Sequence, residues 1–72
     1  MTTRTQAFAV EGMHCQGCVG SVTRAVSKVP GVKHVDVSLE RKSADVEFDS
    51  SQATPDAIVA AIEDAGFDAR VR

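Results

Sequence analysis

The chain has 72 residues and a mass of 7.6 kDa, which is enough for one small domain. Apolar residues make up 43% and charged residues 25%, a composition that argues against disorder. The net charge of −2 and the presence of only three aromatic residues, all phenylalanine, argue against a nucleic-acid surface. We therefore expect residues 1–72 to form a single domain whose small core is built from Val, Ala and Ile.

Charge is divided unevenly along the chain. Residues 1–35 carry a net charge of +3 and residues 36–72 a net charge of −5. This pattern is consistent with solvated faces of either sign or with a docking surface in the first half. The longest apolar run, residues 57–62, is far shorter than the ~20 residues that span a bilayer. The N-terminus lacks the apolar segment of an export signal, so we expect a cytoplasmic protein.

The first half of the chain predicts a strand followed by a helix. Residues 6–10 place Phe8 and Val10 on one face at a period of two, as in a half-buried strand. From residue 16 the period changes, and valines recur at spacings of three and four as on an amphipathic helix: Val19, Val22, Val26 and Val29. Pro30 and Gly31 are expected to end this helix, with Gly31 at the left-handed C-cap position.

The second half predicts a hairpin, a second helix and a last strand. Residues 35–39 and 44–48 alternate apolar and polar residues around a polar turn. Thr54, Pro55 and Asp56 form a helix start, in which Thr54 is the N-cap. The apolar stripe that follows consists of Ile58, Ala61, Ile62 and Ala65, and residues 67–71 again alternate. The resulting β-α-β-β-α-β order predicts an α+β, ferredoxin-like sandwich, with two helices on one face of a four-stranded antiparallel sheet.

The two cysteines, Cys15 and Cys18, follow the first strand with C-x-x-C spacing. A disulfide closing so short a loop would stabilise the fold little, so a metal pair or a redox pair is favoured. Cys18 falls in the first turn of the predicted helix, where the dipole and free N–H groups favour thiolate. Two exposed thiolates suit a soft ion of low coordination number such as Cu(I), whereas Zn(II) prefers four ligands.

The loop Gly-Met-His-Cys-Gln-Gly-Cys, residues 12–18, resembles the metal loop of the heavy-metal-associated domain family. The later Pro30-Gly31-Val32, the Asp64-Ala65-Gly66-Phe67 segment and the element order extend the resemblance over nearly the whole chain. It implies a copper chaperone, not an enzyme, that binds Cu(I) through Cys15 and Cys18. It also implies transfer by thiolate exchange to a metal-binding domain of a copper-transporting P-type ATPase.

Other residues near this motif have candidate roles. Met13 is a candidate thioether ligand, but by the resemblance it points into the core and anchors the loop. Gly12 and Phe67 are expected to support the site, with Phe67 packed beside the loop. His14 is a candidate auxiliary ligand or an exposed, solvated side chain, and His34 receives no role. Arg24 and Lys28 lie on the exposed side of the helix, as a docking surface for an acidic partner or as a solvated face.

Three alternatives stay open at this point. The chain could be the metal-binding module of a P-type ATPase, which Phe67 slightly favours, or a carrier of another soft metal such as Hg, Zn or Cd. A remote alternative is a thiol–disulfide oxidoreductase, because C-x-x-C at a helix start also marks such sites.

The chain is expected to be monomeric without metal, and Cu(I) bound by four sulfurs could bridge two chains into a homodimer.

Overall fold

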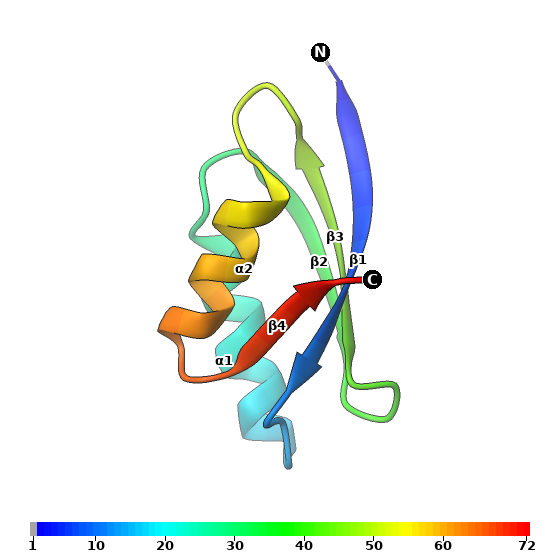
Figure 1. Cartoon of the computed structure of the whole chain (residues 1–72), viewed down its shortest axis with the longest axis vertical. Helices are drawn as coiled ribbons and strands as arrows, with labels where there is room; N and C mark the ends of the chain where they lie inside the picture. Colours follow the sequence, from blue (N-terminus) through cyan, green and yellow to red (C-terminus); the bar gives the residue numbers. More distant parts are fainter. Residues whose placement is uncertain (1) are drawn as a thin grey trace.

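The computed structural model describes residues 2–72 and has the predicted element order (Figure 1). The six elements are β1 (Thr3–Glu11), α1 (Gln16–Ser27), β2 (Val32–Ser38), β3 (Ser43–Asp49), α2 (Pro55–Asp64) and β4 (Asp68–Val71). The strands form one antiparallel sheet in the order β2-β3-β1-β4. Both helices lie on the same side of this sheet (Figure 1). The ferredoxin-like α+β sandwich predicted from the sequence is therefore confirmed.

The core lies between the sheet and the helix layer. Inward-facing residues of β1 and β3 alternate with outward-facing ones, as the period of two predicts. Valine, isoleucine and alanine supply most of the buried side chains, but Phe8 and Phe48 are also fully enclosed. The predicted aliphatic core is therefore present, and two of the three phenylalanines are part of it. The core residues are Phe8, Val10, Met13, Val22, Val26, Ala44, Val46, Phe48, Ala53, Ile58 and Ile62.

The start of α2 follows the predicted capping chemistry. Thr54 has an extended backbone, and its Oγ1 accepts a hydrogen bond of 3.2 Å from the N–H of Ala57. Pro55 occupies the first turn, where its missing N–H costs nothing. At the other end Ala65 is an exposed C-cap residue and not part of the buried stripe, because the helix has already ended at Asp64.

The end of α1 differs from the prediction. Lys28 is the C-cap residue, with a right-handed backbone, so Gly31 is not the left-handed cap of this helix. Gly31 instead has a φ of +93° in the turn that enters β2. A Cβ at this position would lie 2.8 Å from the Cβ of Gln52 and 3.2 Å from the backbone N of Ala53. Glycine is required here by close approach to another loop as well as by its backbone angle.

The first three strands are longer than the pattern predicted, most clearly β1, which begins at Thr3 instead of residue 6. The last strand, β4, is one residue shorter, because it begins at Asp68. Thr3 pairs with Asp49 and Thr5 with Glu47, so a polar stretch is held in the sheet by β3. In the part of the chain that the structure covers, neither helix has the length and apolar character needed to cross a bilayer.

Candidate metal-binding site

The two cysteines lie where β1 ends and α1 begins. This junction forms the lower tip of the molecule in Figure 1. β1 ends at Glu11, and Gly12 turns the chain with a φ of +101°. Met13 then enters the core and is only 3% exposed. Because Met13 is anchored while His14 and Cys15 are exposed, the loop presents these two residues to solvent. The expectation that Met13 packs in the core is confirmed by its burial.

The sulfur atoms of Cys15 and Cys18 lie 3.3 Å apart. Both cysteines are free, since this separation far exceeds the ~2.05 Å of a disulfide bond. Cys15 is exposed, whereas Cys18 is half-buried and packs against the edge of the core. The pair therefore combines one sulfur on a rigid helix with a second on the adjoining loop, and both can reach the same ion.

The first turn of α1 brings the cysteines together. Cys15 is the N-cap residue, and its carbonyl accepts hydrogen bonds from the N–H groups of Cys18 and Val19, at 3.1 and 3.3 Å. Its side chain makes no capping hydrogen bond, so the sulfur stays available. Gly17 lies between the two cysteines, where a Cβ would approach the sulfur of Cys15 to 3.7 Å.

The surroundings of Cys18 favour its thiolate. Its pKa is lowered from the ordinary thiol value of 9.0, first by a hydrogen bond from the backbone of His14. The Cys15 side chain and, to a smaller extent, the Cys15 backbone add to this lowering of the pKa, while burial opposes it. The first turn of α1 contains no acidic residue that would compete for the positive end of the helix dipole. The contribution of the His14 backbone follows from the loop conformation, and no sequence motif indicated it.

Phe67 lies against the loop from the other side. A Cβ placed on Gly12 would be 3.5 Å from Cδ1 of Phe67, which puts the ring in contact range of the loop backbone. Phe67 follows the end of α2 and is half-buried at the edge of the core. The predicted proximity of Phe67 to the metal loop is therefore confirmed, although β4 itself begins one residue later, at Asp68.

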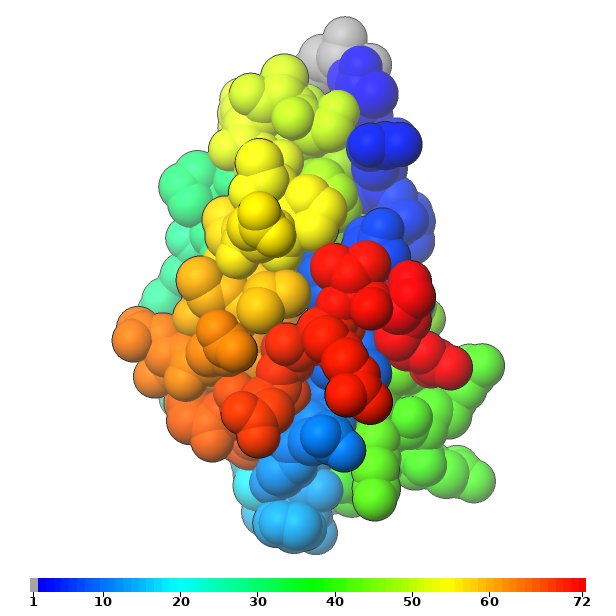
Figure 2. Space-filling view, in the orientation of Figure 1, coloured from blue at the N-terminus to red at the C-terminus, as the bar shows by residue number. Residues whose placement is uncertain are grey.

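The remaining candidate residues are not gathered at the sulfurs. Within residues 2–72, no three His, Cys, Asp or Glu side chains converge as a metal site. His14 is exposed, and His34 lies in β2 opposite Glu47. Arg24 and Lys28 are exposed farther along α1. The described geometry thus offers two sulfur donors, a set that fits a soft ion of low coordination number better than Zn(II). In Figure 2 the loop protrudes at the lower tip, open to an approaching partner.

Several known proteins resemble this chain in sequence and in fold. The chain is 48% identical over 62 residues to copper-transporting ATPase 1 of Mus musculus, covering 86% of this chain and 4% of the ATPase. It is 41% identical over 70 residues to the mercuric transport protein periplasmic component of Shigella flexneri, covering 97% and 77% of the two chains. The solved structure of the CopZ metallochaperone matches with a TM-score of 0.90 and 34% identity, covering 93% of this chain and all of that one. Residues 7–68 match the family model of the heavy-metal-associated domain. The chain therefore belongs to the heavy-metal-associated domain family.

Proposed function

We propose that the chain is a copper(I) chaperone that binds the ion through the thiolates of Cys15 and Cys18. The observation that carries this proposal is the pair of free sulfurs 3.3 Å apart at an open tip. Two thiolates suit Cu(I), which accepts two sulfur ligands almost in line. Gly12, Met13 and Phe67 would act as supporting residues that fix the loop. His14 would become an auxiliary ligand only if its exposed side chain rotated towards the sulfurs.

Transfer would proceed by exchange of thiolate ligands. A thiolate of the acceptor forms a bond to Cu(I), and the bond from one of the two cysteines then breaks. A second exchange releases the ion, whose oxidation state does not change. The exposure of Cys15 supports this order, because an acceptor sulfur can approach from solvent beside it. Cys18, held in the helix with a lowered pKa, would retain the ion longer.

The proposed acceptor is the metal-binding domain of a copper-transporting P-type ATPase, in the cytoplasm. The similarity to copper-transporting ATPase 1 and to the CopZ metallochaperone supports this partner. Arg24 and Lys28 would meet acidic side chains of the acceptor and raise the rate of encounter. Without metal the chain would be a monomer at ordinary concentrations, and Cu(I) shared by four sulfurs would bridge two copies. Residues 1–72 would act as one domain.

Two other functions are supported by particular observations. The chain covers only 4% of copper-transporting ATPase 1, so it could serve as one module of such a protein. The similarity to the mercuric transport protein periplasmic component supports Hg(II) as an alternative cargo and the periplasm as an alternative location. A thiol–disulfide oxidoreductase would use the same two cysteines, and it would reduce insulin without binding metal tightly.

An anaerobic competition titration separates these functions. Reduced protein is titrated with Cu(I), Hg(II) and Zn(II) against chelators of known affinity. The loaded protein is then mixed with an isolated metal-binding domain of a copper ATPase, and the ion is followed after separation of the two chains. Chaperone function predicts one Cu(I) per chain, weak Zn(II) binding and transfer that equilibrates within the mixing time. Preferred binding of Hg(II) without transfer of Cu(I), or insulin reduction without tight metal binding, would contradict it.

A further inference from the structure

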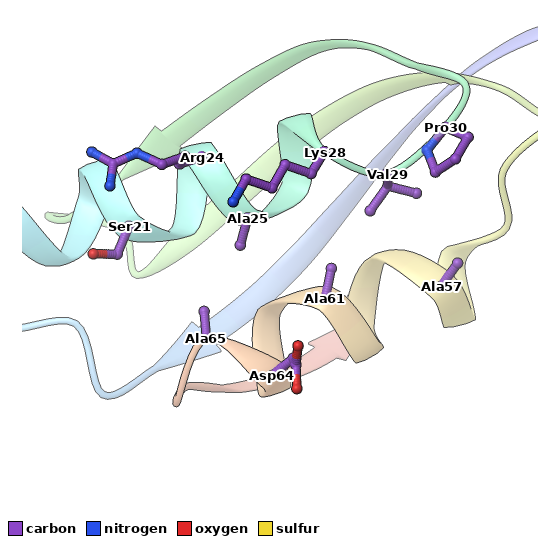
Figure 3. Close-up of a pocket in the computed structure, with 10 residues that line it drawn as sticks. All are labelled: Ser21, Arg24, Ala25, Lys28, Val29, Pro30, Ala57, Ala61, Asp64 and Ala65. Carbon is purple, nitrogen blue, oxygen red and sulfur yellow. The ribbon is translucent and has the colours of Figure 1, made fainter.

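The two helices leave a groove between them on the side of the molecule away from the sheet. The groove has a volume of about 650 Å³ and is lined by residues of both helices. Figure 3 shows Ala25 of α1, and Val29 just beyond the end of that helix, pointing towards α2. Ala57 and Ala61 of α2 point back towards α1. The alanine side chains keep the groove shallow, and its lining is mixed, because Ser21 and three charged residues join the apolar ones. The metal loop is not among its lining residues.

The two walls of the groove carry opposite charges. The α1 wall has no acidic residue and presents Arg24 and, at its C-cap, Lys28. The α2 wall presents Asp64. Asp56 and Glu63 are exposed on the same helix but lie outside the groove lining, and α2 has no basic residue. All five charged side chains are exposed. The helix layer is therefore positive along one helix and negative along the other.

Two of the three acidic residues of α2 do not stabilise the helix in which they lie. Glu63 and Asp64 occupy the last turn, and no basic residue accompanies them there. The C-terminus of a helix carries a partial negative charge, which disfavours carboxylates. Asp56, in the first turn, is by contrast placed favourably. The pair at the C-terminus therefore weakens α2, which points to a use outside the helix itself.

We propose that the helix layer docks with the helix layer of a second copy of this chain. A two-fold axis running along the groove would place α1 of one copy over α2 of the other, and the reverse. Such an axis preserves the position along the groove, so residues at the same level face each other across the interface. Asp64 lies at a level between Arg24 and Lys28 in Figure 3. Each copy would then set Arg24 and Lys28 near Asp64 of its partner, with Glu63 on the neighbouring surface of the same helix.

The size of this surface sets the strength of the association. Helices of 12 and 10 residues are about 18 and 15 Å long. With a molecular width of 20 Å, the layer offers an area on the order of 400 Å² per copy, half of the ~800 Å² of a stable interface. The pairing is consequently weak, and millimolar protein is needed to detect it. It leaves the metal-free chain monomeric at micromolar concentrations and requires no metal.

Complementary charge reversals test the proposal in a background of Cys15→Ser and Cys18→Ser, which excludes metal bridges and disulfides. One variant carries Arg24→Glu with Lys28→Glu, and the other carries Glu63→Lys with Asp64→Lys. Self-association of each, and of their equimolar mixture, is measured by sedimentation equilibrium up to ~2 mM at low and high salt. Asp36→Lys with Asp45→Lys is the control matched to Glu63→Lys with Asp64→Lys, because it makes the same change of net charge on two exposed, paired strand positions. Circular dichroism verifies that every variant is folded.

Each helix variant alone should self-associate about three- to tenfold more weakly than the unreversed chain. The equimolar mixture should associate at least as strongly as that chain, because a basic layer then meets an acidic one. The sheet-face control should retain the helix-layer association, and high salt should weaken the association of the mixture. A chain that remains monomeric at 2 mM, or a mixture that associates no better than its components, would overturn the proposal. Neither result affects the metal-binding proposal, since the assay contains no metal.

Discussion

Replacement of Gly31 by alanine should destabilise the fold strongly. A φ of +93° costs a residue with a Cβ about 1–3 kcal/mol. The added Cβ would also lie 2.8 Å from the Cβ of Gln52, and such overpacking costs about 1–3 kcal/mol more. The turn cannot relax easily, because the Gly31 carbonyl accepts a hydrogen bond of 2.8 Å from the N–H of Asp49. The expected loss is therefore about 2–6 kcal/mol. A domain of this length has a total stability of about 4–11 kcal/mol.

Gly20→Ala provides the matched control for this substitution. Gly20 lies in α1, and a Cβ there would meet no atom within 4 Å. Alanine should stabilise the helix at this position by about 0.5–1 kcal/mol. Urea unfolding followed by circular dichroism measures both variants, with an m-value of about 1 kcal/mol/M. The Gly31→Ala midpoint should fall by about 2–6 M, and the Gly20→Ala midpoint should rise. A Gly31→Ala midpoint equal to that of the parent chain would refute the reasoning.

The remaining predictions concern a cap, a thiol and a carboxylate. Thr54→Ala removes the acceptor of the Ala57 N–H and should cost about 0.5–2 kcal/mol in urea unfolding, while Thr54→Ser should restore most of it. Alkylation of Cys18 in the metal-free protein should follow a pKa below 9.0, and this pKa should rise in the Cys15→Ala variant. An unchanged alkylation profile in that variant would contradict the contribution of the Cys15 side chain. The pKa of Asp49 is lowered by hydrogen bonds from the Ser51 hydroxyl and backbone, so its stabilising contribution is lost as pH falls below the ordinary carboxyl pKa of about 4. In the Asp49→Asn variant, the free energy of unfolding measured in urea should lose this part of its decrease at acidic pH.

The sequence predicted the elements whose determinants are local. The Thr54 cap, the alternation along the strands and the valine spacing of α1 depend on residues close together in the chain, and the structure confirms them. The change of periodicity also placed Cys15 and Cys18 at the junction of a strand and a helix, which is where the structure has them.

Features that depend on contacts between distant segments were not predictable. The role of Gly31 is set by a loop some twenty residues away, at Gln52 and Ala53. The polar start of β1 is strand only because β3 pairs with it. Asp36 and Asp45 face each other across two strands, a pairing that requires the register of the hairpin. The opposing charges of α1 and α2 likewise became meaningful only when the two helices were found side by side.

The central claim is that two thiolates, and no third side chain, hold Cu(I). It is tested most directly by anaerobic Cu(I) competition titration of the parent chain and of the Cys15→Ser, Cys18→Ser and His14→Ala variants. The account predicts one tightly bound Cu(I) in the parent chain, a loss of affinity of at least a hundredfold in either cysteine variant, and little change in His14→Ala. A cysteine variant that retained the parent affinity would contradict it.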